Sequence, residues 1–164
     1  MRTGFATEKT TGTFEQDSLA EFRKGVELLK GDYPQKALAS FRRAFEGDQH
    51  NPYYISFLGL SMARAQRKWD QASELCEIAV QIKPTEIQFH LNLAEVCASA
   101  GLREKALDKL DIALERFGED AQLRQARSKV EMRRTPPLPF IRREHFLNRE
   151  LGKLRHRLLK KRST

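Results

Sequence analysis

The feature that most constrains the fold is a short stretch that occurs three times in the chain. The three copies are "GDYPQKALASFRRAF", "RKWDQASELCEIAV" and "GLREKALDKLDIAL", and successive copies are separated by 35 and then 34 residues. In each copy an alanine is followed four residues later by a larger apolar residue and three residues after that by a second alanine. These spacings place the three side chains on one face of a helix. The sets are Ala37, Phe41 and Ala44; Ala72, Cys76 and Ala79; and Ala106, Leu110 and Ala113.

A small residue also recurs upstream of each copy, as Gly25, Gly59 and Ala94. Two antiparallel helices approach closely only where the side chains between them are small. Each such pair leaves an apolar face that only the next pair covers, so pairs in register stack into a solenoid. The sequence therefore predicts an all-α protein built from three stacked helix pairs.

This pattern resembles the tetratricopeptide repeat (TPR) family over roughly residues 18–118. Further residues that carry the resemblance are Gly31-Asp32-Tyr33 in the first unit, Leu58 and Pro84 in the second, and Leu93 and Gly101 in the third. The departures lie in the loops: the inter-repeat proline expected near Gln49 stands at Pro52, and Gly118 takes its place in the last unit. The resemblance implies a short α-solenoid of three TPR-like helix pairs.

Several residues mark where helices are expected to begin or end. Asn51 before Pro52 is an N-cap followed by proline in the first turn. Thr85 with Gln88 has the spacing of a capping box. Gly118 suits a helix C-terminus, and Asp120 favours the start of a last, capping helix over about residues 120–134.

The chain divides into four expected segments. Residues 1–14 are predicted to be a disordered N-terminus, and residues 15–134 the TPR-like domain with its capping helix. Residues 135–140, "TPPLPF", are a proline-rich linker that cannot continue a helix. Residues 141–164 are predicted to form a separate basic amphipathic helix.

The composition indicates a soluble chain. At 164 residues it suits one domain. It has no run of about 18 apolar residues that would span a membrane, and its start has no apolar stretch of a secretory signal. Two cysteines are too few for a disulfide framework. The protein is therefore expected to be cytoplasmic.

The resemblance implies that the first helix of each pair lines a concave groove, which in this family binds an extended peptide or a partner helix. An apolar stripe on a helix is also what core packing requires, so both interpretations stay open for each residue. The expected partner-groove residues are Phe22, Val26, Leu29, Tyr53, Leu60, Arg64, Leu91 and Glu95.

Chaperone-binding members of the family hold a partner's terminal carboxylate with lysine, arginine and asparagine at set groove positions. The matching positions here hold Phe22, Val26, Leu60, Leu91 and Glu95. These side chains offer no charge-assisted hydrogen bond to a carboxylate. Recognition of heat-shock-protein tails is therefore not expected, and an apolar groove favours an amphipathic helix or an extended hydrophobic segment.

Catalysis finds no support in the residue pattern. The four histidines have no metal-ligand spacing, and no phosphate-binding glycine loop or G-x-S-x-G motif occurs. Cys76 and Cys97 suit small buried apolar positions on facing helices. The sequence predicts a protein that is not an enzyme and that needs no metal or cofactor.

The net charge of +8 is concentrated at the C-terminus. Residues 1–134 hold 21 Lys+Arg against 20 Asp+Glu, whereas residues 135–164 hold 9 against 2. Leu147, Leu151, Leu154 and Leu158 form one helical stripe. The basic tail residues singled out are Arg149, Lys153, Arg155, Arg157, Lys160 and Lys161.

Three interpretations of this tail stay open. The leucine stripe can dock on the repeats or on a second copy of the chain. The tail can bind a partner or an anionic membrane surface. It can also contact nucleic acid through phosphates, without reading sequence and with a strong dependence on salt.

The function expected from these features is a scaffold or adaptor that holds a protein segment in its groove, with the tail as a second contact. One alternative is a chaperone similar to those of bacterial type III secretion translocators, which "FLGLSMARAQRKWDQA" and "FHLNLAEVCASAGLREKAL" resemble. The other is a protein that binds nucleic acid or another anion through the basic helix.

Overall fold

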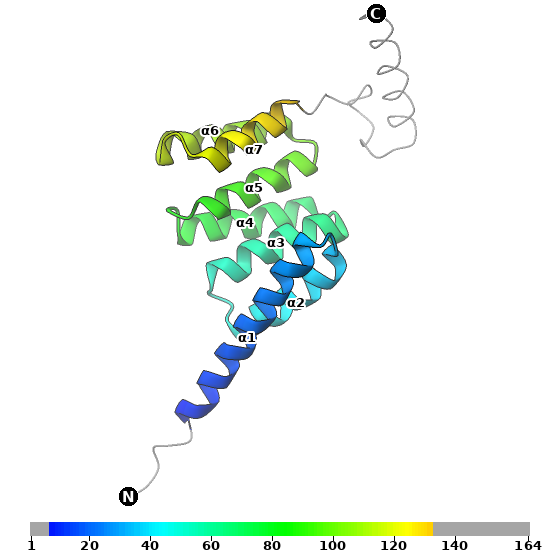
Figure 1. The fold of residues 1–164 in the computed structure, drawn as a ribbon, viewed down its shortest axis with the longest axis vertical. Helices are drawn as coiled ribbons and strands as arrows, with labels where there is room; N and C mark the ends of the chain where they lie inside the picture. The colour runs from blue at the N-terminus through cyan, green and yellow to red at the C-terminus, as the bar shows by residue number, and fades with distance from the viewer. Residues whose placement is uncertain (1–6, 133–164) are drawn as a thin grey trace, which may run out of the picture.

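The computed structural model describes residues 7–132, with side chains from residue 16 onward. This part of the chain is all-α, as predicted, and contains seven helices (Figure 1). They are α1 (Thr7–Lys30), α2 (Pro34–Gly47), α3 (Pro52–Gln66), α4 (Trp69–Ile82), α5 (Ile87–Ser99), α6 (Arg103–Phe117) and α7 (Ala121–Met132). None of these helices is long and apolar enough to cross a membrane.

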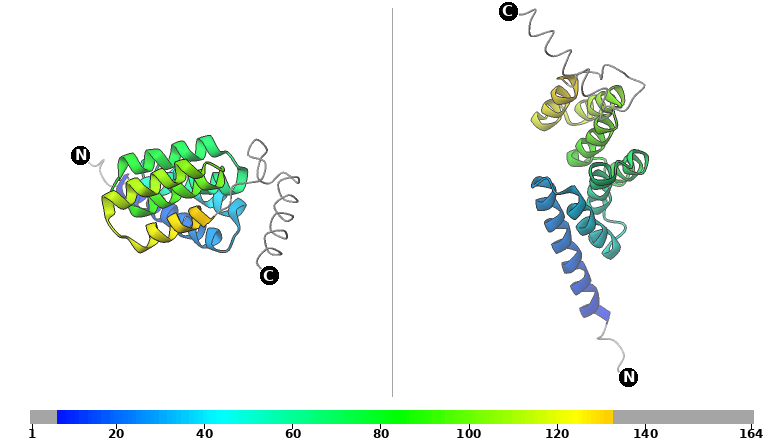
Figure 2. Two further views of the ribbon diagram at one scale, coloured as in Figure 1. Left: turned by 90° about the horizontal axis from the view of Figure 1, so that it is seen from above. Right: turned by 90° about the vertical axis from the view of Figure 1, so that its right-hand side faces the viewer.

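The helices form pairs that stack into a short solenoid. α1 packs on α2, α3 on α4 and α5 on α6, and each even-numbered helix also packs on the odd-numbered helix that follows it. α3 contacts α5, and α5 contacts α7, so the odd-numbered helices share one side of the array. Figure 2 shows α1 and α7 at opposite ends of that side, with a concave surface between them.

The repeated residues make the closest contacts of the structure. The six alanines, together with Phe41, Cys76 and Leu110, have no exposed surface. A Cβ atom added to Gly25 would lie 2.7 Å from the Phe41 ring, and one added to Gly59 would lie 2.8 Å from the carbonyl oxygen of Ala72. These distances are too short for any side chain, so the predicted packing of small residues against the second helix of each pair is confirmed.

Two of the predicted caps are present. The Asn51 side chain accepts a hydrogen bond from the backbone N–H of Tyr53 at 3.0 Å. Asp120 accepts from the backbone N–H groups of Gln122 and Leu123 at 2.8 and 3.0 Å, and so starts α7. α6 ends at Phe117, and Gly118 follows it with a φ of 70°.

The predicted capping box at Thr85 is wrong. α5 begins one residue later than that box requires, with Glu86 at the N-cap position and no side-chain cap. The physical reason is tertiary: Tyr53 donates a hydrogen bond to the Glu86 carboxylate, which holds Glu86 against α3.

The N-terminus also differs from the expectation. α1 begins at Thr7 and so includes residues 7–14, which were expected to be disordered. Once residues 18–29 are held in a helix by packing, adding further turns to it needs no new nucleation. Residues 1–6, the linker 135–140 and the predicted helix 141–164 lie outside the described part of the chain.

We expect Gly25→Ala and Gly59→Ala both to lower the free energy of unfolding, by about 1–3 kcal/mol, because overlap in a packed core outweighs the helix propensity that alanine adds. The two sites differ in what the new methyl group meets. At Gly25 it meets the Phe41 ring, so Phe41→Leu in the same chain should recover about 1 kcal/mol of that loss. At Gly59 it meets backbone, so Phe41→Leu should recover nothing.

Urea unfolding of the four single and double variants measures these differences. An equal effect of Phe41→Leu on both alanine variants would contradict the assigned contacts.

Candidate functional site

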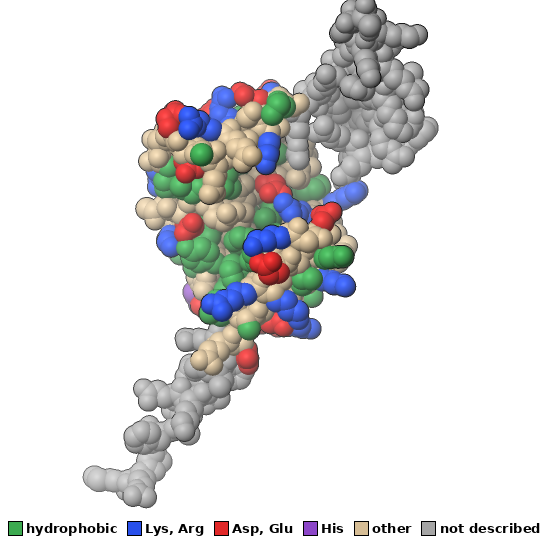
Figure 3. All heavy atoms as spheres, in the orientation of Figure 1, with side chains coloured by type: hydrophobic (Ala, Val, Ile, Leu, Met, Phe, Trp, Pro, Cys, Tyr) green, Lys and Arg blue, Asp and Glu red, His purple; other side chains and the backbone are tan. Residues whose placement is uncertain are grey.

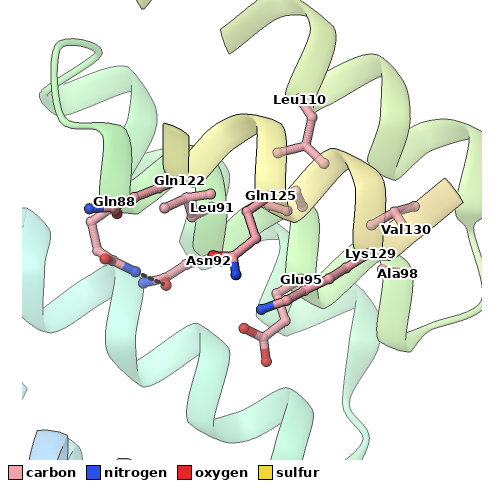
Figure 4. A pocket seen from close by; sticks show the side chains of 12 residues that line it. Gln88, Leu91, Asn92, Glu95, Ala98, Leu110, Gln122, Gln125, Lys129 and Val130 are labelled. Carbon is pink, nitrogen blue, oxygen red and sulfur yellow. Dashed lines mark hydrogen bonds between the residues drawn. The ribbon is translucent and has the colours of Figure 1, made fainter. Parts of the chain in front are cut away.

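A groove of about 350 Å³ opens on the concave side between α5 and α7 (Figure 4). Its two walls come from α5 and α7, which are separated in the sequence by α6, and α6 contributes to the floor between them. The lining residues are Gln88, Leu91, Asn92, Ala94, Glu95 and Ala98 from α5, Leu110 from α6, and Gln122, Gln125, Ala126, Lys129 and Val130 from α7.

The floor of the groove is apolar. The side chains that form it present only hydrocarbon, and they are Leu91, Ala94, Leu110, Ala126 and Val130. Alanine on both facing walls leaves the space that larger side chains would fill. An apolar floor of this kind gains free energy when a ligand's side chain displaces water from it.

The rim of the groove is lined by four amide side chains. Gln88 and Asn92 lie one turn apart on α5, and Gln122 and Gln125 lie one turn apart on α7. Gln88 donates to Asn92 at 2.8 Å, and the buried Asn92 donates to Ser56 of α3 at 2.9 Å. Asn92 is therefore fixed in place by its partners.

Gln122 and Gln125 are exposed. A glutamine side chain carries both a donor and an acceptor. A peptide backbone needs the same pair, so this rim has the chemistry to hydrogen-bond an extended main chain.

The groove carries one charge of each sign, Glu95 and Lys129. Glu95 accepts a hydrogen bond from Nε of Arg64 at 2.7 Å, which joins α3 to α5. Both members of this ion pair are more than a third exposed, so the pair adds little to stability. Its consequence is electrostatic: the carboxylate is already partnered, and the groove as a whole is neutral.

The eight predicted groove residues divide into three groups. Leu91 and Glu95 line the groove, and Arg64 lies beside it through its ion pair with Glu95. Leu29 and Leu60 are buried in the core, with 7% and 4% of their surface exposed. The structure therefore does not bring all eight together in one surface.

The remaining predicted residues make packing contacts. The centroid of the Phe22 ring lies 5.2 Å from that of Tyr54 and 5.3 Å from that of Phe57. These rings form an aromatic cluster that joins α1 to α3. Val26 packs half-buried against the same core.

Tyr53 is held by a polar cluster at the start of α3. Its ring packs edge-on against Phe89 with centroids 4.9 Å apart, and its hydroxyl donates to the Glu86 carboxylate. That hydrogen bond holds the pKa of Glu86 below its ordinary value. Lys83 donates to the same hydroxyl at 2.9 Å, which raises the pKa of Lys83.

Sequence reasoning missed the wall that α7 contributes. α7 was expected only to cap the array through Leu123, Ala126 and Val130, and two of these three residues do turn toward the core as buried side chains. The missed signal is a second stripe on the same helix, next to the apolar one. Its residues are three and then four positions apart: Gln122, Gln125 and Lys129.

His90, Cys76 and Cys97, which lie outside the groove, are accounted for by packing. His90 is buried, its Nε2 lies 3.1 Å from the Pro84 carbonyl oxygen, and its ring packs on Phe117. Burial raises the pKa of Cys76 to about 12 and also raises the pKa of Cys97. Within residues 16–132 no group of three or more histidine, cysteine or acidic side chains is placed to hold a metal ion.

The six basic tail residues lie outside the described residues. The described side chains, residues 16–132, include 17 Lys+Arg and 18 Asp+Glu. On the face shown in Figure 3 charges of both signs are interspersed. The repeat array therefore has no strong charge of its own.

Three solved structures illustrate what this arrangement is similar to. The first TPR domain of Spaghetti (RPAP3), bound to the HSP90 peptide SRMEEVD, has a TM-score of 0.59 at 17% identity, and the alignment covers 71% of this chain and 94% of that one. The OM64 TPR domain of Arabidopsis has a TM-score of 0.60 at 18% identity, covering 72% and 97%. The second TPR domain of human RPAP3, in complex with the HSP70 peptide SGPTIEEVD, has a TM-score of 0.59 at 15% identity. The alignment covers 73% of this chain and 99% of that one.

No protein-family model and no curated protein matches the sequence. At identities this low the structural likeness speaks for the fold alone. The chain has the tetratricopeptide repeat fold, with α7 as a capping helix.

We expect Tyr53→Phe to lower the free energy of unfolding by about 0.5–1.5 kcal/mol at pH 7, because it removes the hydrogen bond to Glu86. A carboxyl whose pKa is lowered by folding stabilises the protein above its unfolded pKa, about 4.3, and loses that contribution as the pH falls through its folded pKa. The difference between the variant and the parent should therefore shrink between pH 5 and pH 3.

Urea unfolding at several pH values measures this difference. Tyr33→Phe is the control, because the Tyr33 ring is 57% exposed. A difference from the parent that stays constant down to pH 3 would contradict the role of Glu86.

Proposed function

We propose that the protein is a non-catalytic interaction scaffold that holds a segment of a partner protein in the groove between α5 and α7. The observation that supports this most directly is the combination of an apolar floor with the exposed amides of Gln122 and Gln125 on the rim. Such a surface suits an extended or helical segment whose side chains enter the floor and whose backbone faces the rim. No part of the proposal needs a reaction.

The charge of the groove favours an uncharged segment. The peptides in the complexes of RPAP3 domains, SRMEEVD and SGPTIEEVD, are acidic at their C-terminal ends. Here Glu95 faces the groove and is paired with Arg64, and Lys129 is the one cation of the lining itself. A segment with several acidic residues would meet repulsion and no cluster of cations.

The basic tail, residues 141–164, is proposed as a second contact of the same scaffold. Its charge makes binding to an acidic partner surface or to nucleic acid sensitive to salt. Joined to the groove on one chain, such a contact would raise the affinity for a partner that reaches both. The type III secretion chaperone alternative shares the groove and differs only in the partner, so the same experiment bears on it.

The groove is tested with Gln122→Glu/Gln125→Glu in the full-length chain. The two substitutions are nearly isosteric, lie on the exposed rim, and replace two donors with negative charge. We expect capture of protein partners from lysate to fall by about tenfold or more, which corresponds to losing about 1.4 kcal/mol or more of binding free energy.

Gln71→Glu/Gln81→Glu is the matched control, because both glutamines are exposed on α4, on the opposite side of the array. Each capture is repeated after nuclease treatment and compared by mass spectrometry. Equal loss in both double variants, or capture that nuclease abolishes, would count against the groove and in favour of the basic tail.

A further inference from the structure

The chain leaves the repeat array at one end of the groove. α7 ends at Met132, and Lys129 and Val130 line the groove two or three residues earlier. Arg103 of α6 donates to the carbonyl oxygens of Val130 and Glu131 at 3.3 and 3.2 Å. This contact holds the last turn of α7 against α6.

The residues that follow have a composition that suits the groove. Residues 135–140 read "TPPLPF", with no charge, three prolines and two large apolar side chains. Proline has no N–H, so the carbonyl groups of this segment cannot be paired in a regular ladder. They are free to accept hydrogen bonds from side-chain donors in place of water.

We propose that residues 135–140 dock in the groove between α5 and α7 of the same chain and compete there with the partner segment. This inference rests on the proposed function of the groove and adds its regulation. The amides of Gln122 and Gln125 donate to the carbonyl groups of the segment, and Leu138 and Phe140 enter the apolar floor.

The reach of the chain is sufficient. The wall that α7 forms, from Gln122 to Val130, is about 12 Å long, because it spans eight residues of α-helix. Six proline-rich residues extend to about 19 Å. Two residues, Arg133 and Arg134, separate the segment from Met132, which is exposed at the end of α7, and the proposal requires the chain to turn back within them.

The neighbouring tail helix is a poorer occupant. Residues 141–164 carry a leucine stripe among many cations. The groove offers one carboxylate, Glu95, which Arg64 already binds. A neutral segment matches a neutral groove, whereas a cationic helix does not.

Tethering makes weak docking effective. A short linker holds the segment near the groove at an effective concentration of the order of millimolar. A segment that fills half to nine tenths of the grooves would lower the apparent affinity for a partner about two- to tenfold. Removing the segment's contacts would restore that affinity.

Paramagnetic relaxation in the full-length chain tests the docking. Spin labels are placed on Ser128→Cys, an exposed site on α7 beside the groove, and separately on Glu74→Cys, an exposed site on α4. The native Cys76 and Cys97 are buried and react slowly. In a tail that does not dock, broadening by the label at residue 128 falls with distance along the chain. We therefore expect Leu138 and Phe140 to broaden at least as strongly as residues 133–135 with the label at residue 128, and not to broaden with the label at residue 74.

Leu138→Asp should restore the steady fall of broadening along the chain and raise partner capture about two- to tenfold, while Leu147→Asp should leave both unchanged. Broadening in the parent chain that falls steadily from residue 133 to residue 140, or that is strongest at Leu147–Leu158, overturns the docking. Broadening without a gain in capture overturns the competitive role. The label experiment involves no partner, so its failure is separate from failure of the glutamine variants in capture.

Discussion

The close approach of the two helices in each pair is the contact on which the rest of the structure depends. It occurs where Gly59 meets the backbone of Ala72, and where Gly25 meets the ring of Phe41. A side chain at Gly59 would meet the backbone of Ala72 and push the two helices of that pair apart, and one at Gly25 would displace the Phe41 ring. Because the small residues fix this spacing in each unit, the odd-numbered helices fall on one side and form the concave surface. The groove is thus a consequence of this packing, and two of its lining residues, Ala94 and Leu110, belong to the repeat pattern itself.

α7 turns that surface into a groove by being held at both ends. Asp120 caps its first turn, and Arg103 binds the carbonyl oxygens of its last turn. Between these points Arg127 donates to Asp111 of α6 at 2.5 Å. A capping helix needs only a polar outer face to end a solenoid. Here its inner edge also faces α5 across a hollow, because Ala126 stands where a larger residue would close it.

The sequence predicted the fold well because the repeat is a local pattern read three times. Fully buried Ala72 and Cys76 stand where the register places them. It predicted the groove less well, because the concave stripe and the core stripe of an odd-numbered helix overlap. Leu60 and Leu91 look alike in sequence, yet Leu60 is buried and Leu91 lines the groove. The difference depends on how closely the next odd-numbered helix packs on the one that carries the leucine: α5 packs more extensively on α3 than α7 does on α5. The start of α5 was missed for a related reason, since Glu86 is held by Tyr53 of a distant helix.

The neutrality of the groove and the charge of the tail have to be considered together. A neutral, amide-rimmed groove selects by shape and backbone hydrogen bonds, and its affinity changes little with salt. A basic helix attracts acidic surfaces over about 8–10 Å and weakens as salt rises. Only eight residues separate Met132, at the end of the groove, from the predicted basic helix at residues 141–164. Two surfaces that acted on separate targets would not need so short a connection. Under the docking proposed above, the short proline-rich segment would couple them, because whatever occupies the groove would also decide where residues 141–164 are held. The composition of this segment would then matter to binding as much as its length.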